Sequence, residues 1–242
     1  NDAFKSIWID QILKPNQIVI VLDGPISKEL NGVVRKWKRE IGKRMIVIPL
    51  KENRGLGDAL AFGLSHCDFE YIARMDTDDI SMPNRFDIQL NFLKANKNID
   101  IVGSSVIEFD KQINIIRGTR HVPEDHKDIL KFSKYRNPFN HPSVIYRKSK
   151  VIEAGGPVNF TDFDDYYLWV KMFNVNAKCA NIAKPLIYMR ANVNQARRRG
   201  GYSYLKNEIK FLNFLVSINH INLIQFCTNL LIRLPIRLIP YK

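Results

Sequence analysis

The sequence contains few cysteines. Only three occur in 242 residues, at positions 67, 179 and 227, and no two of them form a Cys-x-x-Cys pair. An odd and scattered set disfavours both a zinc site and a disulfide framework, so we expect the chain to work in a reducing cytoplasm. The sequence also lacks an apolar run of about eighteen residues and a charged-then-apolar leader. Neither a membrane-spanning helix nor a signal peptide is therefore predicted.

Acidic residues are scarce relative to basic ones. The chain has 24 Asp and Glu against 37 Lys and Arg, which is a formal net charge of +13 at pH 7. Residues 190–242 contain nine of the basic residues and one acid, Glu208, which is a net charge of +8. Such an excess predicts an anionic partner, and both a nucleic acid and the anionic face of a bilayer fit it.

The overall composition is that of a folded chain. Hydrophobic residues make up 45% and charged residues 25%, and 242 residues allow one large domain or two small ones. In the first half, short β-branched runs alternate with helical patterns, which is typical of βα units and predicts an α/β fold with a largely parallel sheet. The expected strands span 17–22, 45–50 and 71–75, and the expected helices span 3–13, 28–41 and 58–65.

The alternation continues beyond residue 80. A helix is predicted with Ser81 as its N-cap and Pro83 in its first turn, ending at Asn96. Strands are expected at 99–109 and 141–146, with a hairpin-like segment and a short helix near 125–132 between them. Helical spacing of apolar residues from 166 to 173 predicts another helix, which Asp164 and Asp165 immediately precede.

Carboxylates follow two of the predicted strands. Asp23 comes after the strand at 17–22, and Asp76, Asp78 and Asp79 come after the strand at 71–75. Ligands of open α/β sheets bind outside the carboxyl ends of the strands, so both groups lie where a ligand is expected. Crowded carboxylates are costly unless a cation relieves them, and Mg²⁺ or Mn²⁺ with nucleotide phosphates would do so. The alternative is that these acids only cap helices and decorate loops.

Several short motifs occur in a recognisable order. They read VLDGP at 21–25, NRGLG at 53–57, RMDTDD at 74–79, PNRF at 83–86 and DDYYLW at 164–169. With these motifs the chain resembles the family-2 inverting glycosyltransferases of the GT-A fold, especially the bacterial enzymes of O-antigen, capsule and exopolysaccharide synthesis. The resemblance covers roughly residues 1–190. It implies a Rossmann-like, mostly parallel mixed sheet flanked by helices, and an enzyme that transfers a hexose from a nucleotide-diphosphate sugar, with a UDP-sugar as the expected donor.

The resemblance also implies roles for individual residues. Asp23, Asn53 and Arg54 would contact the base of the nucleotide, Asp76 its ribose, and Asp78 the Mn²⁺ or Mg²⁺ ion. The family's first strand would precede residue 1, so we expect this sequence to begin inside a longer reading frame.

Two further segments are assigned by the same comparison of residues. Arg198 and Arg199, in a run of three arginines before two glycines, are expected to close over the diphosphate. A solvated charge run is the alternative. His141 is expected to face a phosphate or the acceptor, with a structural histidine as the alternative.

Asp164 and Asp165 resemble the acidic pair that serves the acceptor in this family. Asp165 would be the base that deprotonates the acceptor hydroxyl, and a single displacement would then invert the anomeric centre. This chain departs from the family at the first position of the pair, where Asp164 replaces the usual Glu, so the catalytic base is assigned to Asp165.

The C-terminal part differs from the rest of the chain. We expect a nucleotide-sugar and acceptor domain at 1–189 and a basic, amphipathic helical segment at 190–242. This segment would lie on the anionic inner face of the plasma membrane, near a lipid-linked glycan acceptor; packing against the domain is the alternative. Competing functions are a nucleotidyltransferase, which the pair at 164–165 does not support, and a basic nucleic-acid-binding protein. We expect no nucleic-acid partner, because the basic excess gathers in an apolar segment.

Overall fold

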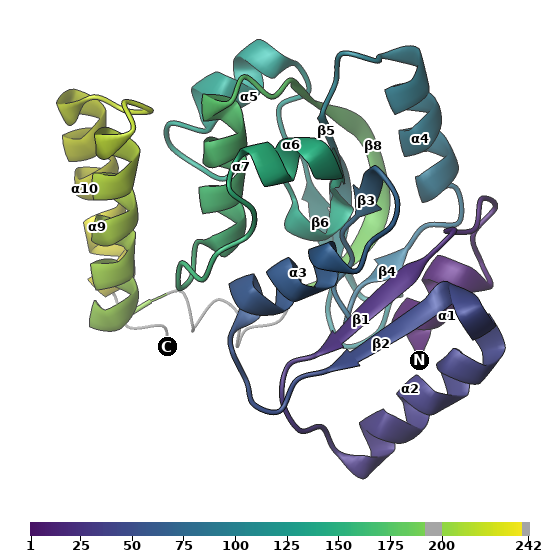
Figure 1. The fold of residues 1–242 in the computed structure, drawn as a ribbon. Coiled ribbons are helices and arrows are strands. Elements are labelled where there is room, and N and C mark those ends of the chain that lie inside the picture. Colours follow the sequence, from purple (N-terminus) through teal and green to yellow (C-terminus); the bar gives the residue numbers. More distant parts are fainter. Residues whose placement is uncertain (192–199, 239–242) are drawn as a thin grey trace.

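The computed structural model describes residues 1–191 and 200–238. Two sheets and the helices around them form the body of the molecule, and a pair of helices stands at one side (Figure 1). The helices and their bounds are α1 (Asp2–Trp8), α2 (Lys28–Ile41), α3 (Leu56–Ser65), α4 (Arg85–Ala95), α5 (His126–Phe132), α6 (Lys148–Glu153), α7 (Asp164–Asn174), α9 (Tyr202–Ser217) and α10 (Leu223–Leu238).

The smaller sheet consists of two parallel strands, β1 (Ile18–Leu22) and β2 (Met45–Pro49). Helix α2 connects them, and its amphipathic sequence buries Val34, Trp37 and Ile41 while its charged residues stay outside. Ser27 caps this helix by accepting a hydrogen bond from the backbone N–H of Leu30 at 3.2 Å. The βα unit expected here is confirmed.

The larger sheet is mixed. Its order is β3 (Tyr71–Ala73), β7 (Ile145–Arg147), β5 (Ile101–Phe109), β8 (Cys179–Arg190) and β4 (Ile80–Ser81), and β6 (Ile116–Arg120) also pairs with β5. Strands β5 and β8 run in parallel, and the other pairings are antiparallel. The expected mixed α/β sheet is thus confirmed. Fewer of its strand pairs are parallel than the alternation of strands and helices indicates, because the short strands β4, β6 and β7 pair antiparallel with β5 or β8.

Three local expectations are wrong. Ser81 does not cap a helix but lies in β4, where tertiary contacts hold it: its N–H donates to the Ser6 hydroxyl at 3.0 Å, and its own hydroxyl accepts from the Gln11 amide at 3.1 Å. The first helix ends at Trp8 rather than near residue 13, since the buried Gln11 side chain instead donates to the Ser6 and Met82 carbonyls. The strand expected at 141–146 is a 3₁₀ turn at 141–143 followed by β7.

Helix α9 packs on α7 through a cluster of aromatic rings. The rings of Phe163 and Phe211 stack with centroids 4.8 Å apart, and those of Tyr167 and Phe214 stack at 4.2 Å. Phe211 is fully buried in the same core as the residues of α7. The first C-terminal helix therefore packs against the domain, which is the alternative left open by the sequence.

Helix α10 is held to α9 by a buried carboxylate. Glu208 is 1% exposed and accepts hydrogen bonds from Arg233 at 2.7 Å and Arg237 at 2.9 Å, both on α10. The helix continues past Pro235. Within the described ranges 1–191 and 200–238, no helix has the length and apolar character needed to cross a membrane.

Replacing Glu208 tests how strongly this carboxylate holds the helix pair. We expect Glu208→Gln to lower the free energy of unfolding by about 3 kcal/mol, because two arginines lose the charge that compensates them in a buried setting. The matched control is Glu153→Gln, which removes the exposed partner of Lys150 and should leave stability unchanged. Denaturant unfolding followed by circular dichroism measures both, and equal stabilities of the two variants would contradict the prediction.

Candidate active site

Asp23 organises the loop that follows β2. Its two carboxylate oxygens accept hydrogen bonds from the backbone N–H groups of Arg54 at 2.7 Å and Gly55 at 3.1 Å. Gly24 has a positive φ of 93°, and a Cβ there would lie 2.8 Å from the backbone nitrogen of Asn53, so the close approach of the two loops requires glycine. The structure thus brings together Asp23, Asn53 and Arg54, the three residues expected at the base.

The carboxylates after β3 lie in unlike environments. Asp78 is exposed, whereas Asp79 is 2% exposed and accepts the backbone N–H of Arg190 at 2.7 Å. Burial raises the pKa of Asp79 to about 7, against the lowering effect of that hydrogen bond. Arg190, the last residue of β8, also donates through its guanidinium to the Asp78 carbonyl at 3.2 Å. The end of β8 therefore fixes the Asp76–Asp79 loop.

Two arginines supply positive charge beside this loop. Arg74 forms an ion pair with Asp76 at 3.3 Å. Arg85 is completely buried and donates to the Arg74 carbonyl at 2.7 Å and to Gln89 at 3.0 Å. Burial lowers the pKa of Arg85 to about 9, so the group stays cationic at neutral pH. Part of the carboxylate crowding expected from the sequence is thus relieved by the protein itself.

The acidic pair lies in the first turn of α7, as expected. Asp165 accepts hydrogen bonds from the Asn137 amide and from the backbone N–H of Tyr166, both at 2.8 Å. Asp164 instead accepts the backbone N–H of Phe160 at 2.8 Å, and burial raises its pKa. The carboxylate of Asp164 therefore closes the turn that leads into α7, while that of Asp165 faces other side chains.

His141 lies between the two groups of carboxylates. Its Nε2 is 3.7 Å from Asp76 Oδ1, and its Nδ1 is 3.6 Å from Asp165 Oδ2. Arg74 also forms a hydrogen bond with Nε2. Burial, and then the charge of Arg74, lower the pKa of His141, although both carboxylates act in the opposite direction. Asp76, which follows β3, and Asp165, which begins α7, thus meet at one imidazole.

The acids after β3 have the chemistry to hold a divalent cation. In the part of the chain that the structure describes, no three His, Cys, Asp or Glu side chains gather into a metal cluster. Mg²⁺ and Mn²⁺ do not need one, because they commonly take one or two carboxylates and complete their shell with water and phosphate oxygens. Exposed Asp78, two residues from Asp76, fits this mode of binding.

Four further residues belong to this site although the sequence did not predict a role for them: Arg74, Arg85, Asn137 and Arg190. Arg74 and Arg85 were visible only as members of the motifs at 74–79 and 83–86. Asn137 carries no local signal, and Arg190 ends a strand whose pattern is not periodic. The arginines expected to cover the diphosphate, Arg198 and Arg199, lie outside the described residues.

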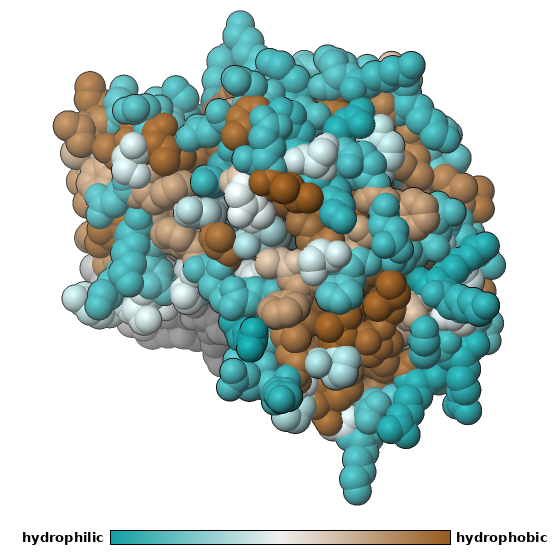
Figure 2. Space-filling view, viewed as in Figure 1, coloured by the Kyte–Doolittle hydropathy of each residue, from teal (hydrophilic) through white to brown (hydrophobic). Residues whose placement is uncertain are grey.

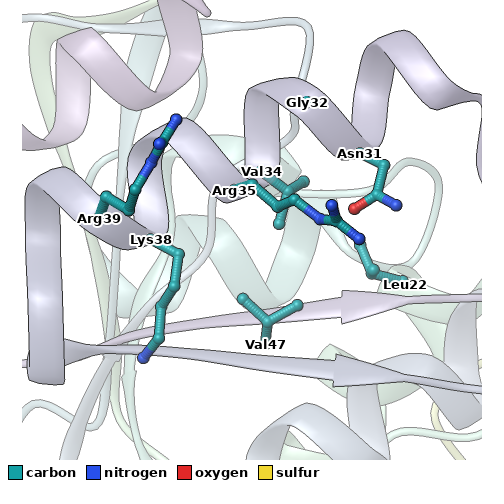
Figure 3. Close-up of a pocket in the computed structure, with 8 residues that line it drawn as sticks. All are labelled: Leu22, Asn31, Gly32, Val34, Arg35, Lys38, Arg39 and Val47. Atoms are coloured by element: carbon teal, nitrogen blue, oxygen red, sulfur yellow. The ribbon is translucent and has the colours of Figure 1, made fainter.

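A hollow of about 580 Å³ lies elsewhere, between α2 and the strands β1 and β2 (Figure 3). Its apolar lining includes Leu22, Val34 and Val47, and Arg35 and Lys38 are among the polar residues around it. None of its lining residues is a carboxylate or a histidine.

The fold and these carboxylates define an α/β protein with a polar site at the ends of its strands, where ligands of open α/β sheets bind. The family model for glycosyl transferase family 2 matches residues 5–156. The amylovoran biosynthesis glycosyltransferase AmsE of Erwinia amylovora is 34% identical over 232 residues, 96% of this chain and 86% of that protein. A UDP-Gal:alpha-D-GlcNAc-diphosphoundecaprenol beta-1,3-galactosyltransferase of Escherichia coli is 35% identical over 240 residues, with 99% and 86% covered. The chain belongs to glycosyl transferase family 2 and is a glycosyltransferase.

Solved structures show the same fold. The chain superimposes on residues 1–349 of Staphylococcus aureus TarS with a TM-score of 0.66 at 16% identity, covering 90% of this chain and 60% of that one. For the mannosyltransferase PcManGT of Pyrobaculum calidifontis the TM-score is 0.60 at 13% identity, with 88% and 58% covered. The chain thus spans about three fifths of these structures, and the GT-A fold expected from the sequence is confirmed.

Two helical glycines give a matched test of the contact between the start of α3 and the segment before α7. A Cβ on Gly57 would lie 2.1 Å from the Val158 carbonyl carbon, whereas a Cβ on Gly32 meets nothing within 4 Å. We expect Gly57→Ala to destabilise the protein by about 2 kcal/mol through overpacking. Gly32→Ala should stabilise it by about 0.5 kcal/mol, because alanine favours a helix. Thermal unfolding measures both changes, and a Gly57→Ala variant as stable as the wild type would show that α3 and the backbone at Val158 are not in close contact.

Proposed function

We propose that this glycosyltransferase moves a hexose from a UDP-sugar to a hydroxyl of a lipid-linked surface-polysaccharide acceptor, with inversion and with a divalent cation. The observation that carries the proposal is the meeting of Asp76 and Asp165 at His141. Asp76 belongs to the motif that we expect to bind the nucleotide, and Asp165 is the residue that we expect to act on the acceptor. Their contact with one imidazole brings these two residues close together. Donor and acceptor would then be close enough for a direct transfer.

The donor side rests on the two loops around Asp23 and Asp76. Asp23, Asn53 and Arg54 would bind the base, Asp76 the ribose, and Asp78 an Mn²⁺ or Mg²⁺ ion. When bound, that ion supplies charge that stabilises the departing nucleoside diphosphate. Arg198 and Arg199 would add positive charge on the same leaving group.

The acceptor side rests on Asp165. Its carboxylate would take the proton of the acceptor hydroxyl as the oxygen attacks the anomeric carbon from the face opposite the leaving diphosphate. Asn137 holds one carboxylate oxygen by a hydrogen bond of 2.8 Å and so limits rotation of the base. A single displacement of this kind converts an α-linked donor into a β-linked product.

The names of similar proteins support the choice of substrates. One relative is named as a galactosyltransferase that uses UDP-Gal and an undecaprenol-linked acceptor, and TarS has been solved with UDP-GlcNAc. PcManGT has been solved with GDP-Man and Mn²⁺. A UDP-sugar and a lipid-linked glycan are therefore the first donor and acceptor to test, and a GDP-sugar is the second donor.

Calorimetric titration of UDP tests the nucleotide site. We expect binding with Mn²⁺ present, and a loss of at least about tenfold in affinity on removing the metal or in Asp78→Ala. Asp128→Ala, which alters an exposed acid on α5, is the control and should bind as the wild type does. An affinity for UDP that is the same without the metal and in Asp78→Ala would contradict the assignment of Asp78 as a metal ligand. If no nucleoside diphosphate bound at all, the proposed donor would be wrong.

We propose further that residues 190–242 form a segment that contacts the anionic inner face of the plasma membrane. One face of α10 packs inward through Asn229 and Arg233, and the opposite face is apolar and exposed. The exposed fractions on this face are 70% for Leu223, 77% for Ile224, 75% for Leu231 and 57% for Ile232. Figure 2 shows hydrophobic side chains along the edge of the molecule where α10 lies. An apolar stripe within a basic segment suits a bilayer with anionic headgroups.

Sedimentation with lipid vesicles tests this contact. The wild type should bind vesicles that contain phosphatidylglycerol. It should bind less well to vesicles of pure phosphatidylcholine, and less well at high salt. A double change, Ile224→Asp with Leu231→Asp, should lower the bound fraction at least about tenfold by removing apolar burial. Leu30→Asp, on the exposed surface of α2, is the control. Equal binding by the double variant and the control would rule out α10 as the contact surface.

A further inference from the structure

The position of His141 determines which of its nitrogens carries the proton. Its Nε2 is hydrogen-bonded to the guanidinium of Arg74, which can only donate. Nε2 must therefore be the acceptor in this pair, and the proton of the neutral ring is on Nδ1. The pKa of His141 is lowered by burial, which favours this neutral form.

The Nδ1 proton points to the proposed base. Nδ1 is shielded from solvent and has no hydrogen-bond partner among the described residues, and Asp165 Oδ2 lies 3.6 Å from it. The same oxygen already accepts from Asn137 at 2.8 Å. A shift of a few tenths of an ångström would complete a second hydrogen bond to Asp165, and such bonds often tighten when substrate binds.

The other side of the imidazole is tied to the nucleotide loop. Arg74 donates to Nε2 and forms the 3.3 Å ion pair with Asp76. Without the imidazole, the described partners of the Arg74 guanidinium would be reduced to Asp76. A single ion pair would then hold its orientation. The imidazole of His141 thus contacts Arg74 on the side of the nucleotide loop and Asp165 on the side of the acceptor.

We propose that His141 is a positioning residue that couples the two halves of the active site, with Nε2 anchoring Arg74 beside Asp76 and Nδ1–H orienting Asp165. This inference rests on the proposed function, because it takes Asp76 as a nucleotide contact and Asp165 as the base. It assigns His141 a role through these two side chains rather than a direct contact with phosphate or acceptor.

Two amide substitutions separate the two contacts. In His141→Asn the side-chain amide reaches the place of Nδ1, so a donor to Asp165 is kept and the acceptor for Arg74 is lost. In His141→Gln the amide reaches the place of Nε2, so the acceptor for Arg74 is kept and the donor to Asp165 is lost. Each variant therefore removes one of the two contacts and keeps the other.

The measurements are kcat for sugar transfer and the Kd for UDP with Mn²⁺. We expect His141→Gln to lower kcat at least about tenfold with Kd within about twofold. His141→Asn should raise Kd about tenfold and keep kcat within about threefold. Thermal unfolding of both variants shows whether they fold.

A double-mutant cycle adds a second readout. Asn137→Ala removes the hydrogen bond that Asp165 Oδ2 already accepts, so its effect on kcat should be non-additive with that of His141→Gln, because both act on this one oxygen. Non-additivity supports the coupling even if one histidine variant is less stable. Additive effects would overturn the orienting role.

The remaining outcomes separate this inference from the proposed function. Equal changes in kcat and Kd for the Asn and Gln variants would show a merely structural histidine and overturn the coupling alone. A wild-type protein that transfers no sugar from any nucleotide donor would overturn both proposals. Opposite losses in the two variants, one in kcat and one in Kd, would establish the coupling.

Discussion

The buried charge of Arg85 is the constraint on which the site depends. Three acids within four residues repel one another, and Asp79 has little contact with water to screen it. Arg85 places a cation beneath them without any exposure, and it holds the Arg74 carbonyl at the end of β3. Uncompensated burial of either partner would be costly, so the loop and helix α4 stabilise each other. The exposed acid, Asp78, is left available for a ligand.

Strand β8 connects this electrostatic arrangement to the rest of the fold. It lies between β5 and β4 in the larger sheet, and its last residue, Arg190, binds Asp79 through its N–H and the Asp78 carbonyl through its guanidinium. The chain that leaves β8 leads to α9, whose aromatic residues pack on α7, the helix that begins with the acidic pair. Strand β8 thus links the Asp76–Asp79 loop to helices α7 and α9, which share one hydrophobic cluster with Cys179 of that strand.

Much of this structure could be predicted where the signal is local. The strand and helix of the first βα unit follow from periodicity, and the acids at strand ends and at the start of α7 were identified from their positions. What failed depends on distant partners. Ser81 has the chemistry of a helix cap, but Ser6 and Gln11 hold it in a strand. Strand β8, with Lys184 and Pro185 inside it, has no alternating pattern, and Asn137 joins the site only through the fold that brings it to Asp165.

The contact of Gly57 with the backbone at Val158 also limits which substitutions the protein can accept in evolution. Neither partner is a side chain that could turn aside, since the close atoms at 158–159 belong to the main chain. A larger residue at 57 becomes acceptable only after the segment before α7 has already moved. That segment carries Asn159, whose amide binds the Arg54 carbonyl at 2.9 Å. A change in residues 53–57 that adds bulk at position 57 therefore requires a matching shift of the backbone at 158–159, so these two segments, far apart in the sequence, change together.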